Sequence, residues 1–495
     1  MNARKPLAIT DSWWMRDMPL NRRFDRLASR HSTEILIIGA GITGLSTAIE
    51  LAQRGHRATV CEAEAIGAGT TAASTGHLDA HPEIEPTALI DRIGVEHARA
   101  YTHLRSAAID QIESLANSRC DLVRIPAFSY SESSRAQSNM REQFEAACQI
   151  GLEAQWCDRI PIPRGACGYR IDAMARIDCA AYLLHLTQRA VDLGVTIFEQ
   201  TLVEGPVEEQ PTSLAAGAGE IHFEHVVCAT HCSYTKGNLL YAATPPYQSY
   251  VLVARVKNPP SDALFWDNSN PYFYTRHATS ETPNLLVIGG CDHRTGTVDS
   301  RKPTAQLEDW VRERFDVEEI LQHWSAEFFE PTDSMPMIGL APGKKNIWVA
   351  TGYSGAGLTT GTVAAALIAD GIEGKPIALA ETFSPSRLAL SSDWIMEQAT
   401  ATANLAQRIL PASSIVAADL EKGAGAVGKI DGKHTAICRD AEGCEHRMSP
   451  ICTHMGGVVQ WNDAEQTWDC PLHGGRFAAD GTRIYGPPES DLETI

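Results

Sequence analysis

Two cysteines and two histidines near the C-terminus have the types and spacing of metal ligands. Cys452 and His454 are separated by one residue, and after 15 further residues Cys470 and His473 follow with two residues between them. Each short segment therefore offers one thiolate and one imidazole. Such mixed pairs suit a [2Fe–2S] cluster in which two sulfurs bind one iron and two nitrogens bind the other. A zinc ion is the alternative, although zinc fingers pair Cys with Cys and His with His.

A second set of residues, near the N-terminus, could hold a dinucleotide. Gly39, Gly41 and Gly44 form the pattern G-x-G-x-x-G, and Glu62 lies 23 residues after Gly39. The glycines of this pattern permit a tight turn, a close approach of the backbone to a pyrophosphate and close packing of a helix on a strand. A carboxylate at the position of Glu62 accepts the ribose hydroxyls and disfavours a 2′-phosphate. A glycine-rich turn in an unrelated α/β fold is the alternative.

The elements around these glycines have the order of a βαβ unit. The apolar run 35–38 predicts a strand buried on both faces, and apolar residues at helical spacing predict a helix over 45–54. Residues 57–61 predict a second strand, which ends at Glu62. A strand, a glycine-rich turn and a helix recur over 346–370.

The character of the sequence changes near 405–415, where a helical segment gives way to short strands with glycine turns. We therefore expect two domains, 1–405 and 406–495. The first should combine an α/β, Rossmann-like dinucleotide-binding part with an interleaved α+β substrate part. The second should be small and all-β. Residues 1–30 contain the pair Trp13–Trp14 and are expected to form an arm over the first domain.

Composition excludes several classes of protein. The chain has 495 residues, of which 44% are hydrophobic and 21% are charged, as in globular domains. A net charge of −19 disfavours binding to nucleic acid and to anionic lipid. No apolar stretch approaches the roughly 20 residues of a membrane span, and no secretory signal is visible. Thirteen cysteines, an odd number, predict a reducing compartment and hence the cytoplasm.

About residues 10–400 resemble the FAD-dependent D-amino-acid-oxidase-like family, the group of glycine oxidase, sarcosine oxidase and γ-glutamylputrescine oxidoreductase. The resemblance is carried by the dinucleotide motif, the small and hydroxylic segment 66–79, the strand 226–230 and the segment 333–339, in that order. It implies that the backbone at Val203 meets the adenine and that the turn 352–358 lies against the flavin. The implied FAD-binding residues are Gly39, Gly41, Gly44, Glu62, Thr70, Thr71, Val203, Gly352, Gly357 and Leu358.

The same resemblance suggests residues for the substrate side of the flavin. Tyr272, Tyr274 and Arg276 alternate on a predicted strand, and in this family a strand in this region faces the substrate. Arg276 could bind a carboxylate with two parallel hydrogen bonds; the alternative is a solvent-facing arginine on an edge strand. Tyr353 lies in the flavin turn. The catalytic candidates are therefore Tyr353, Arg276 and Tyr274, whereas His293 is expected only to cap a turn.

Residues 414–495 resemble the Rieske family, on the ligand pattern and on the flanking segments 455–457, 474–477 and 486–488. The resemblance implies that Cys452, His454, Cys470 and His473 are the ligands of a [2Fe–2S] cluster.

The C-terminal segment departs from high-potential Rieske proteins at four positions. Those proteins have a disulfide where this chain has Gly457 and Leu472, and they have Ser and Tyr hydroxyls where it has Gly475 and Phe477. Fewer hydrogen bonds to sulfur stabilise the reduced cluster less, so we expect a potential near the low end of the range of about −150 to +300 mV.

Together the two resemblances imply an FAD-dependent dehydrogenase. A small organic substrate, an amine or amino acid, would reduce the flavin, and the electrons would pass through the cluster to an external acceptor, a basic-faced redox protein or a quinone. A single dinucleotide fingerprint argues against a nicotinamide as the donor, and a cluster would be redundant if oxygen took both electrons. The alternatives are a redox-sensing or electron-carrier module, and inward electron flow from a ferredoxin to the flavin.

Overall fold

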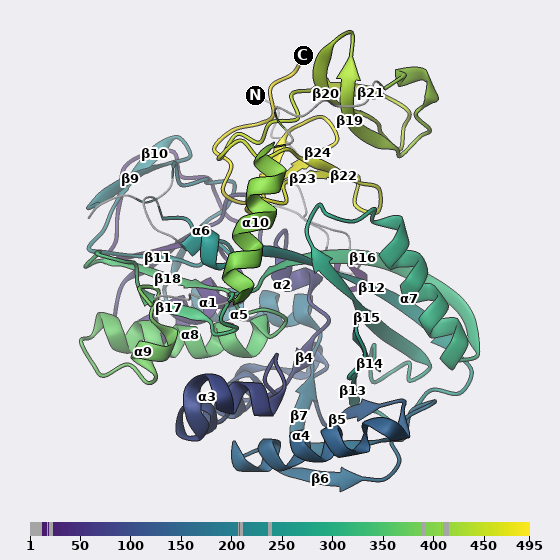
Figure 1. The fold of residues 1–495 in the computed structure, drawn as a ribbon. Helices are drawn as coiled ribbons and strands as arrows, with labels where there is room; N and C mark the ends of the chain where they lie inside the picture. Colours follow the sequence, from purple (N-terminus) through teal and green to yellow (C-terminus); the bar gives the residue numbers. More distant parts are fainter. Residues whose placement is uncertain are drawn as a thin grey trace.

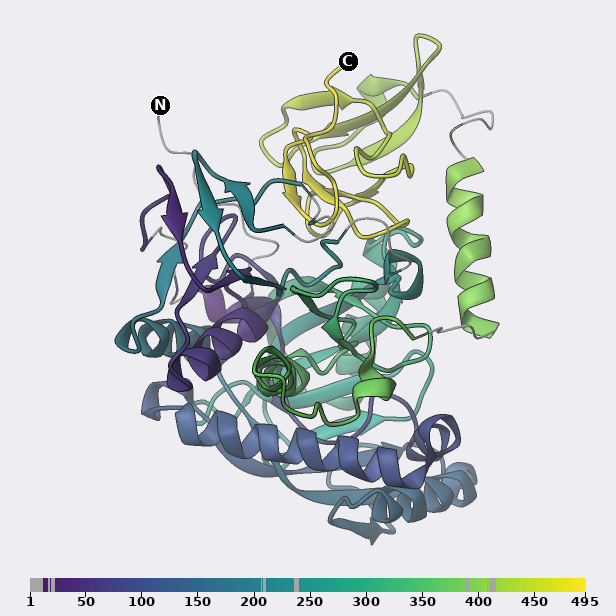
Figure 2. The ribbon, with the colours of Figure 1, turned by 90° about the vertical axis from the view of Figure 1, so that its left-hand side faces the viewer.

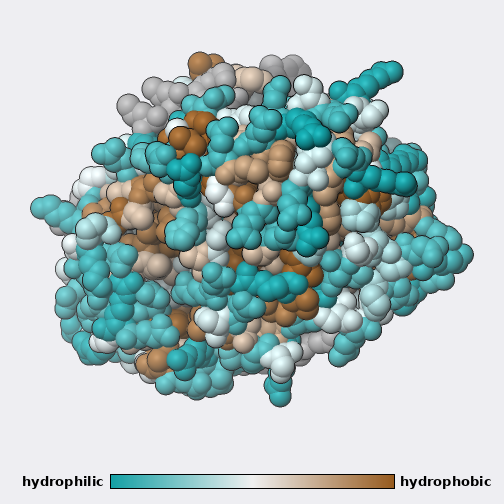
Figure 3. Space-filling view, turned by 90° about the horizontal axis from the view of Figure 1, so that it is seen from below, coloured by the Kyte–Doolittle hydropathy of each residue, from teal (hydrophilic) through white to brown (hydrophobic). Residues whose placement is uncertain are grey.

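The larger of the two domains is built on two sheets, and a smaller C-terminal domain sits on it (Figure 1). A computed structural model describes residues 12–16, 18, 23–205, 207, 211–235, 240–387, 392–406, 408 and 415–495. No helix in this part of the chain combines the length and the apolarity that crossing a bilayer requires. Seen from below the orientation of Figure 1, hydrophilic residues cover most of the surface, with apolar residues in separate patches between them (Figure 3).

The first sheet has six strands, of which the inner neighbours pair in parallel. In spatial order the strands are β17 (Met337–Leu340), β18 (Ile347–Thr351), β11 (His225–Cys228), β2 (Ile35–Ile38), β3 (Ala58–Cys61) and β8 (Thr196–Phe198). Only the edge strand β17 runs antiparallel to its neighbour β18. The side chains of β2 are all buried, as expected for a strand covered on both faces.

Helices cover the six-stranded sheet and close the predicted βαβ unit. Helix α1 (Ile42–Gln53) follows β2 directly, packs against α8 (Gly357–Ile372) and also contacts α5 (Cys179–Asp192). The two predicted strand–turn–helix segments therefore lie side by side.

The second sheet is larger and forms the other half of this domain. Its strands are, in spatial order, β16 (Val317–Phe329), β12 (Pro246–Val256), β15 (Leu285–Arg294), β14 (Phe273–His277), β13 (Leu264–Asp267), β5 (Val123–Ser131), β7 (Cys167–Arg176) and β4 (His77–Leu78), with β6 (Ala154–Cys157) paired to β7. The helices α3 (Pro86–Leu115), α4 (Gln137–Gln149) and α7 (Arg301–Arg314) pack on it.

The two sheets are interleaved along the chain. Strands of the six-stranded sheet fall near residues 35–61, 196–228 and 337–351, and those of the larger sheet occupy the intervals between them. This confirms the predicted α/β fold with an interleaved α+β part. The remaining short elements of this domain are η1 (Trp13–Arg16), β1 (His31–Ser32), α2 (Thr70–Ala73), η2 (Ser118–Cys120), η3 (Ser134–Ala136), β9 (Ser213–Ala216), β10 (Gly219–His222), α6 (Leu240–Ala243) and α9 (Ala380–Phe383).

The C-terminal domain consists of two small antiparallel sheets, which confirms the all-β prediction. One contains β19 (Gly425–Ile430), β20 (Lys433–Arg439) and β21 (Glu445–Met448); the other contains β22 (Gln460–Asn462), β23 (Thr467–Asp469), β24 (Arg476–Ala478) and β25 (Arg483–Tyr485). The segment η4 (Ala417–Asp419) precedes them. Trp468 and Phe477 are fully buried in the core of this domain.

Helix α10 (Ser392–Ala406) lies alongside both domains (Figure 2). At its middle the Gln398 amide donates to the Ala242 carbonyl at 3.0 Å, and near its end the Asn404 amide donates to the Val458 carbonyl at 3.1 Å. The helix thus bridges the two domains. The boundary between residues 405 and 406 falls at its last residue and remains a prediction.

The N-terminal arm contacts the first domain where the structure describes it. Trp13 and Trp14 are buried, and the Trp14 indole N–H donates to the Ser74 carbonyl at 2.8 Å. Residues 1–11 of the predicted arm lie outside the described residues.

Candidate active site and cluster centre

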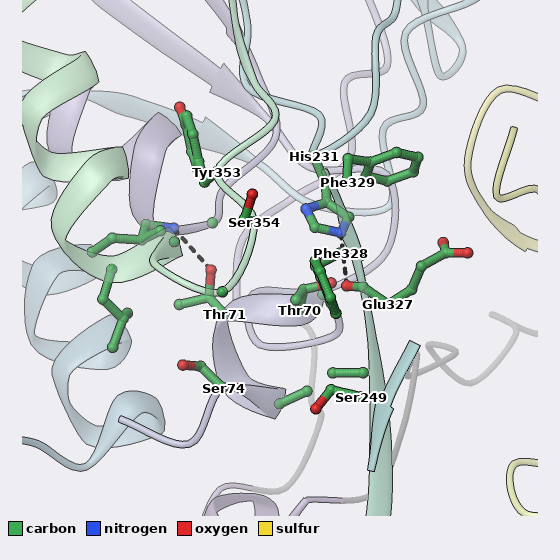
Figure 4. A pocket seen from close by; sticks show the side chains of 18 of the residues that line it. Thr70, Thr71, Ser74, His231, Ser249, Glu327, Phe328, Phe329, Tyr353 and Ser354 are labelled. Atoms are coloured by element: carbon green, nitrogen blue, oxygen red, sulfur yellow. Dashed lines mark hydrogen bonds between the residues drawn. The ribbon is translucent and has the colours of Figure 1, made fainter. Parts of the chain in front are cut away.

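A cavity of about 600 Å³ lies where the carboxyl ends of β2, β3, β11 and β18 meet the larger sheet. This is the edge at which ligands bind in α/β folds with parallel strands. Figure 4 shows part of it: Thr71 and Tyr353 come from one side, and His231, Glu327 and Phe329 come from the other.

The predicted dinucleotide motif forms one end of this cavity. Gly39 has a φ of +101°, which favours glycine, and a Cβ at Gly44 would lie 1.9 Å from the Gly39 carbonyl oxygen. The Glu62 carboxylate accepts hydrogen bonds from the Ala40 N–H at 2.9 Å and the Glu64 N–H at 3.0 Å. Burial raises the pKa of Glu62. Close helix packing and a fixed carboxylate at the strand end fit the adenosine half of FAD.

Hydroxyl groups line the next part of the cavity. The Thr71 hydroxyl accepts a hydrogen bond from the Ile42 N–H at 3.1 Å, at the start of α1 (Figure 4). A Cβ at Gly41 would lie 3.1 Å from that hydroxyl, so backbone and side chain approach closely. The Thr70 hydroxyl is buried and has no hydrogen-bond partner among the described residues. An unpartnered buried hydroxyl fits a polar ligand such as the phosphate or ribityl part of FAD.

The flavin turn also lines the cavity. Gly352, Gly357 and Leu358 are among the lining residues, and Gly352 has a φ of +71°. Helix α8 begins here, so its positive end faces the cavity. Val203 lines the cavity too, and its carbonyl accepts a hydrogen bond from the Tyr234 hydroxyl at 2.6 Å. Nine of the ten implied FAD residues therefore line one continuous space, and the tenth, Gly44, packs against the Gly39 backbone.

Two of the three catalytic candidates lie in this cavity. Tyr274 lines it and its hydroxyl lies 3.1 Å from the Ser249 hydroxyl. Tyr353 lines it too, but its hydroxyl accepts a hydrogen bond from Thr43 at 3.3 Å and is thereby held against α1. Their catalytic roles remain predictions.

The third candidate, Arg276, is wrong as a carboxylate-binding residue. Arg276 is fully buried and is not among the cavity-lining residues. Its guanidinium donates to the carbonyls of His277 (2.7 Å) and Ile177 (3.1 Å) and lies over the Trp14 ring, with Cζ 4.9 Å from the ring centroid. Arg276 lies further along β14 than Tyr274, where the N-terminal arm covers the strand. It therefore has a structural role.

Sequence reasoning missed three residues of the substrate side, namely Ser249, Trp266 and Asp292, which line the cavity from β12, β13 and β15. The one local signal was the pair Gly289–Gly290 inside a strand. A Cβ at Gly289 would lie 2.2 Å from the Tyr274 ring, so the glycine makes room for that ring. His293 does not line the cavity, and it does not cap a turn as predicted: it lies within β15, where it pairs with Gln248 of β12 and its Nδ1 lies 3.2 Å from the Cys291 carbonyl oxygen.

The four predicted cluster ligands lie on two loops of similar backbone geometry. In the first loop the Cys452 N–H donates to the Gly457 carbonyl at 2.8 Å, and in the second the Cys470 N–H donates to the Gly475 carbonyl at 2.8 Å. The return bonds also match, because the N–H four residues after each cysteine donates to that cysteine's carbonyl. The two loops therefore present their thiols and imidazoles in the same way.

The ligands form a thiol pair and an imidazole pair. The thiols of Cys452 and Cys470 are buried and interact with each other, and the ring centroids of His454 and His473 are 5.0 Å apart. The Nδ1 atom of His473 is buried and has no hydrogen-bond partner among the described residues. An orphaned ring nitrogen beside two paired thiols fits a two-iron cluster with unlike ends.

No three His, Cys, Asp or Glu side chains in the described part of the chain are gathered so as to hold one metal ion. A larger side chain would be crowded at two of the four positions where the chain departs from high-potential Rieske proteins. A Cβ at Gly457 would lie 2.8 Å from the Cys470 sulfur, and one at Gly475 would lie 2.5 Å from the Pro488 Cγ atom.

Comparison with known proteins matches both parts of the chain. The family of FAD-dependent oxidoreductases (DAO) matches residues 34–371, and the Rieske [2Fe–2S] domain matches residues 413–495. The Bacillus subtilis (strain 168) protein YhfW, which is named as a Rieske 2Fe-2S iron-sulfur protein, is 30% identical over 483 residues and covers 95% of each chain.

Solved structures share the fold of the larger domain. Glycine oxidase from Geobacillus kaustophilus is similar with a TM-score of 0.61 and 21% identity, over 72% of this chain and 99% of that one. L-proline dehydrogenase from P. horikoshii is similar with a TM-score of 0.58 and 17% identity, over 73% and 98% of the two chains.

Proposed function

Because the chain belongs to the family of FAD-dependent oxidoreductases and carries a C-terminal Rieske [2Fe–2S] domain, we propose that it is a dehydrogenase of small amines or amino acids that delivers electrons to an external acceptor. FAD and the [2Fe–2S] cluster are its two cofactors. When bound, the flavin accepts a hydride from the substrate and the cluster carries single electrons. The names of the similar solved structures, a glycine oxidase and an L-proline dehydrogenase, support a substrate with a CH–NH group.

One observation carries the proposed electron path: both domains line the same cavity. Residues 483–486 of the C-terminal domain lie among the residues that line the dinucleotide cavity. Beside them, the His231 and Tyr485 rings are 6.1 Å apart, and the His231 and Phe329 rings are 4.9 Å apart.

Strand β16 of the larger domain also contacts the second cluster loop. The Glu327 side chain points from β16 toward the C-terminal domain (Figure 4), and a Cβ at Gly474 would lie 2.9 Å from its Oε2 atom and from Phe329. Gly474 is the neighbour of His473. The Tyr241 ring also lies 4.9 Å from the ring of His454 and 5.5 Å from that of His473. The second cluster loop therefore packs against Glu327 and Phe329, which line the flavin cavity.

This arrangement favours a relay over an oxidase, in which oxygen would take both electrons at the flavin. A redox-sensing module and inward electron flow from a ferredoxin remain the alternatives. The acceptor should be a redox protein with a basic face or a quinone. The basic face follows from the charge of residues 414–495, which hold 7 Lys+Arg and 13 Asp+Glu, a net charge of −6. We also propose a cytoplasmic location, because all thirteen cysteines lie in the described part of the chain and none of them forms a disulfide.

The relay is tested with the full-length variant Cys470→Ser, which removes one cluster ligand but none of the cavity. Substrate should still bleach the flavin in one anaerobic turnover, whereas reduction of a one-electron acceptor should collapse. Stopped-flow absorbance measures both steps. Cys438→Ser is the matched control, because Cys438 is buried in the same domain and is not a cluster ligand, and its thiol donates to the Ala479 carbonyl at 3.3 Å. Unchanged acceptor reduction in Cys470→Ser would overturn the relay and leave the cluster a sensing or structural role.

A further inference from the structure

The substrate side of the cavity has the chemistry of a cation site. We propose that it binds a cationic amine without a neighbouring carboxylate group, through Asp292 and an aromatic wall of Trp266, Tyr272 and Tyr274. This inference rests on the proposed function and narrows its substrate class. It departs from the α-amino acids, which would need a cationic group in the cavity to hold their carboxylate.

The cavity offers no free cation for such a carboxylate. Among the lining residues in the described part of the chain, Arg483 is the only Lys or Arg. Its guanidinium donates to the carbonyls of Pro488 at 2.6 Å and Gly486 at 2.9 Å, within the C-terminal domain. Arg276, the other candidate, is turned to backbone carbonyls as described above. A substrate carboxylate would therefore be desolvated without a charged partner.

Carboxylates are instead frequent in this cavity, and three of those on the substrate side already have partners. Asp79 and Glu83 lie 2.7 Å and 3.3 Å from the buried guanidinium of Arg105. Asp267 accepts hydrogen bonds from the Ser269 hydroxyl and the Phe273 N–H, both at 2.8 Å. The protein itself therefore already provides these three carboxylates with ion-pair or hydrogen-bond partners.

Asp292 differs from them. Its Oδ1 atom is buried and has no hydrogen-bond partner among the described residues, and the carboxylate has no ion pair there. The hydroxyls of Ser249 and Tyr272 lie beside the same carboxylate. An unpartnered buried carboxylate oxygen is costly, and an ammonium N–H would satisfy it.

The fold turns Asp292 toward the cavity by an irregularity in the sheet. The register between β12 and β15 shifts between Gln248 and Tyr250, and Cys291, the residue before Asp292, has a φ of +60°. A bulge of this kind re-aims a side chain, and strained backbone persists where the surroundings require it. Ser249 lies in the same irregularity, so both groups are brought to one point.

Aromatic rings complete the site. The Tyr272 and Tyr274 rings are 5.9 Å apart, and the His77 ring lies 5.3 Å from Tyr274 and 6.1 Å from Trp266. Burial lowers the pKa of His77 well below its usual value, so this imidazole is neutral and does not repel a cation. Aromatic faces attract ammonium groups, and more strongly when water is excluded.

Two probes that differ by one carboxylate group test the inference. n-Butylamine is a cation, and norvaline carries the same chain with an added carboxylate on the amine-bearing carbon. Each probe, norvaline as both enantiomers, is titrated anaerobically into the full-length holoenzyme, and binding is followed by calorimetry and by perturbation of the flavin spectrum. We expect n-butylamine to bind at least about tenfold more tightly than either enantiomer of norvaline. Tighter binding of norvaline would overturn the inference, and this comparison requires no variant.

The variant Asp292→Asn tests the residue itself. Because it replaces a charge-assisted contact, it should weaken n-butylamine binding by roughly 10- to 100-fold. The control is Asp267→Asn, which changes a carboxylate of the same cavity that the protein already satisfies, and it should weaken binding by less than about threefold. Equal affinities in Asp292→Asn and wild type would overturn the role of Asp292. If cations bind as expected but no amine bleaches the flavin, the cation site stands and the proposed dehydrogenase function fails.

Discussion

At the scale of single residues, the ionisation of Asp292 predicts how the affinity for n-butylamine depends on pH. Burial raises the pKa of Asp292 to about 6, against the hydrogen bonds from Ser249 and Tyr272, which lower it. Burial raises the pKa of Tyr272 and Tyr274 and lowers that of His77, so these three groups stay neutral near that pH, whereas burial raises the pKa of Asp267 to about 6 and that of Glu83 to about 7, and these two carboxyl groups titrate in the same range. Protonation of Asp292 removes its charge, so n-butylamine affinity should be full above pH 7 and fall by up to about tenfold per unit below pH 6. Calorimetry between pH 5 and about pH 8 checks this.

The same titration of Asp292→Asn serves as the control, since an amide does not ionise in this range. Its affinity should be low and should change less with pH than that of the wild type, because the carboxyl groups that still titrate, Asp267 and Glu83, already have partners in the protein. A wild-type affinity that changes with pH no more than that of the variant would mean that Asp292 is not the group that binds the cation.

At the scale of elements, the packing of α1 on the turn after β2 builds the adenosine end of the cavity. Gly44 is the critical residue, because a Cβ there would lie 1.9 Å from the Gly39 carbonyl oxygen. Gly44→Ala should force α1 away from the turn, destabilise the protein by about 1–3 kcal/mol and lower its FAD content. Thermal unfolding and flavin absorbance per chain measure the two effects, and iron per chain should change less than flavin.

Glu50→Ala is the control for this helix. Glu50 pairs with Arg54 one turn later at 2.7 Å on the outer side of α1, so its loss should cost less than about 1 kcal/mol and leave FAD bound. Full FAD retention by Gly44→Ala would show that α1 can shift without disrupting the FAD-binding turn that precedes it.

At the scale of the whole molecule, a buried network joins the domains next to the cluster. Arg476 donates to both carboxylate oxygens of Asp469 at 2.8 and 2.9 Å and, across the interface, to the Gln248 side-chain oxygen at 3.0 Å. Asp469 precedes the ligand Cys470. Arg476→Gln should leave Asp469 buried without its counterion, at a cost of about 3–5 kcal/mol, and should slow electron transfer from flavin to cluster. Thermal unfolding and stopped-flow reduction of the cluster check the two parts.

Arg439→Gln is the matched control in the same domain, because Arg439 is partly exposed and lies 3.9 Å from Glu445 within that domain. It should change neither quantity appreciably. If Arg476→Gln lowers stability but transfers electrons at the wild-type rate, the other contacts between the domains set the geometry of the relay.

The sequence alone determined the parts whose chemistry needs a fixed local spacing. A pyrophosphate cradle requires glycines at set intervals after a strand, so Gly39, Gly41, Gly44 and Glu62 could be recognised before any fold was known. The paired Cys and His residues of the cluster loops follow the same logic, because each loop places its two ligands through its own short backbone.

Tertiary structure alone decided the substrate side. Tyr274 and Arg276 alternate on one strand, yet one reaches the cavity and the other lies beneath Trp14, because a distant segment covers that end of the strand. No local sequence pattern indicated Asp292, because the direction of its side chain depends on a register shift between β15 and β12. The contact of the cluster loop with the flavin cavity likewise depends on how two domains dock. Each of these depends on pairing between residues far apart in the chain, which local spacing does not encode.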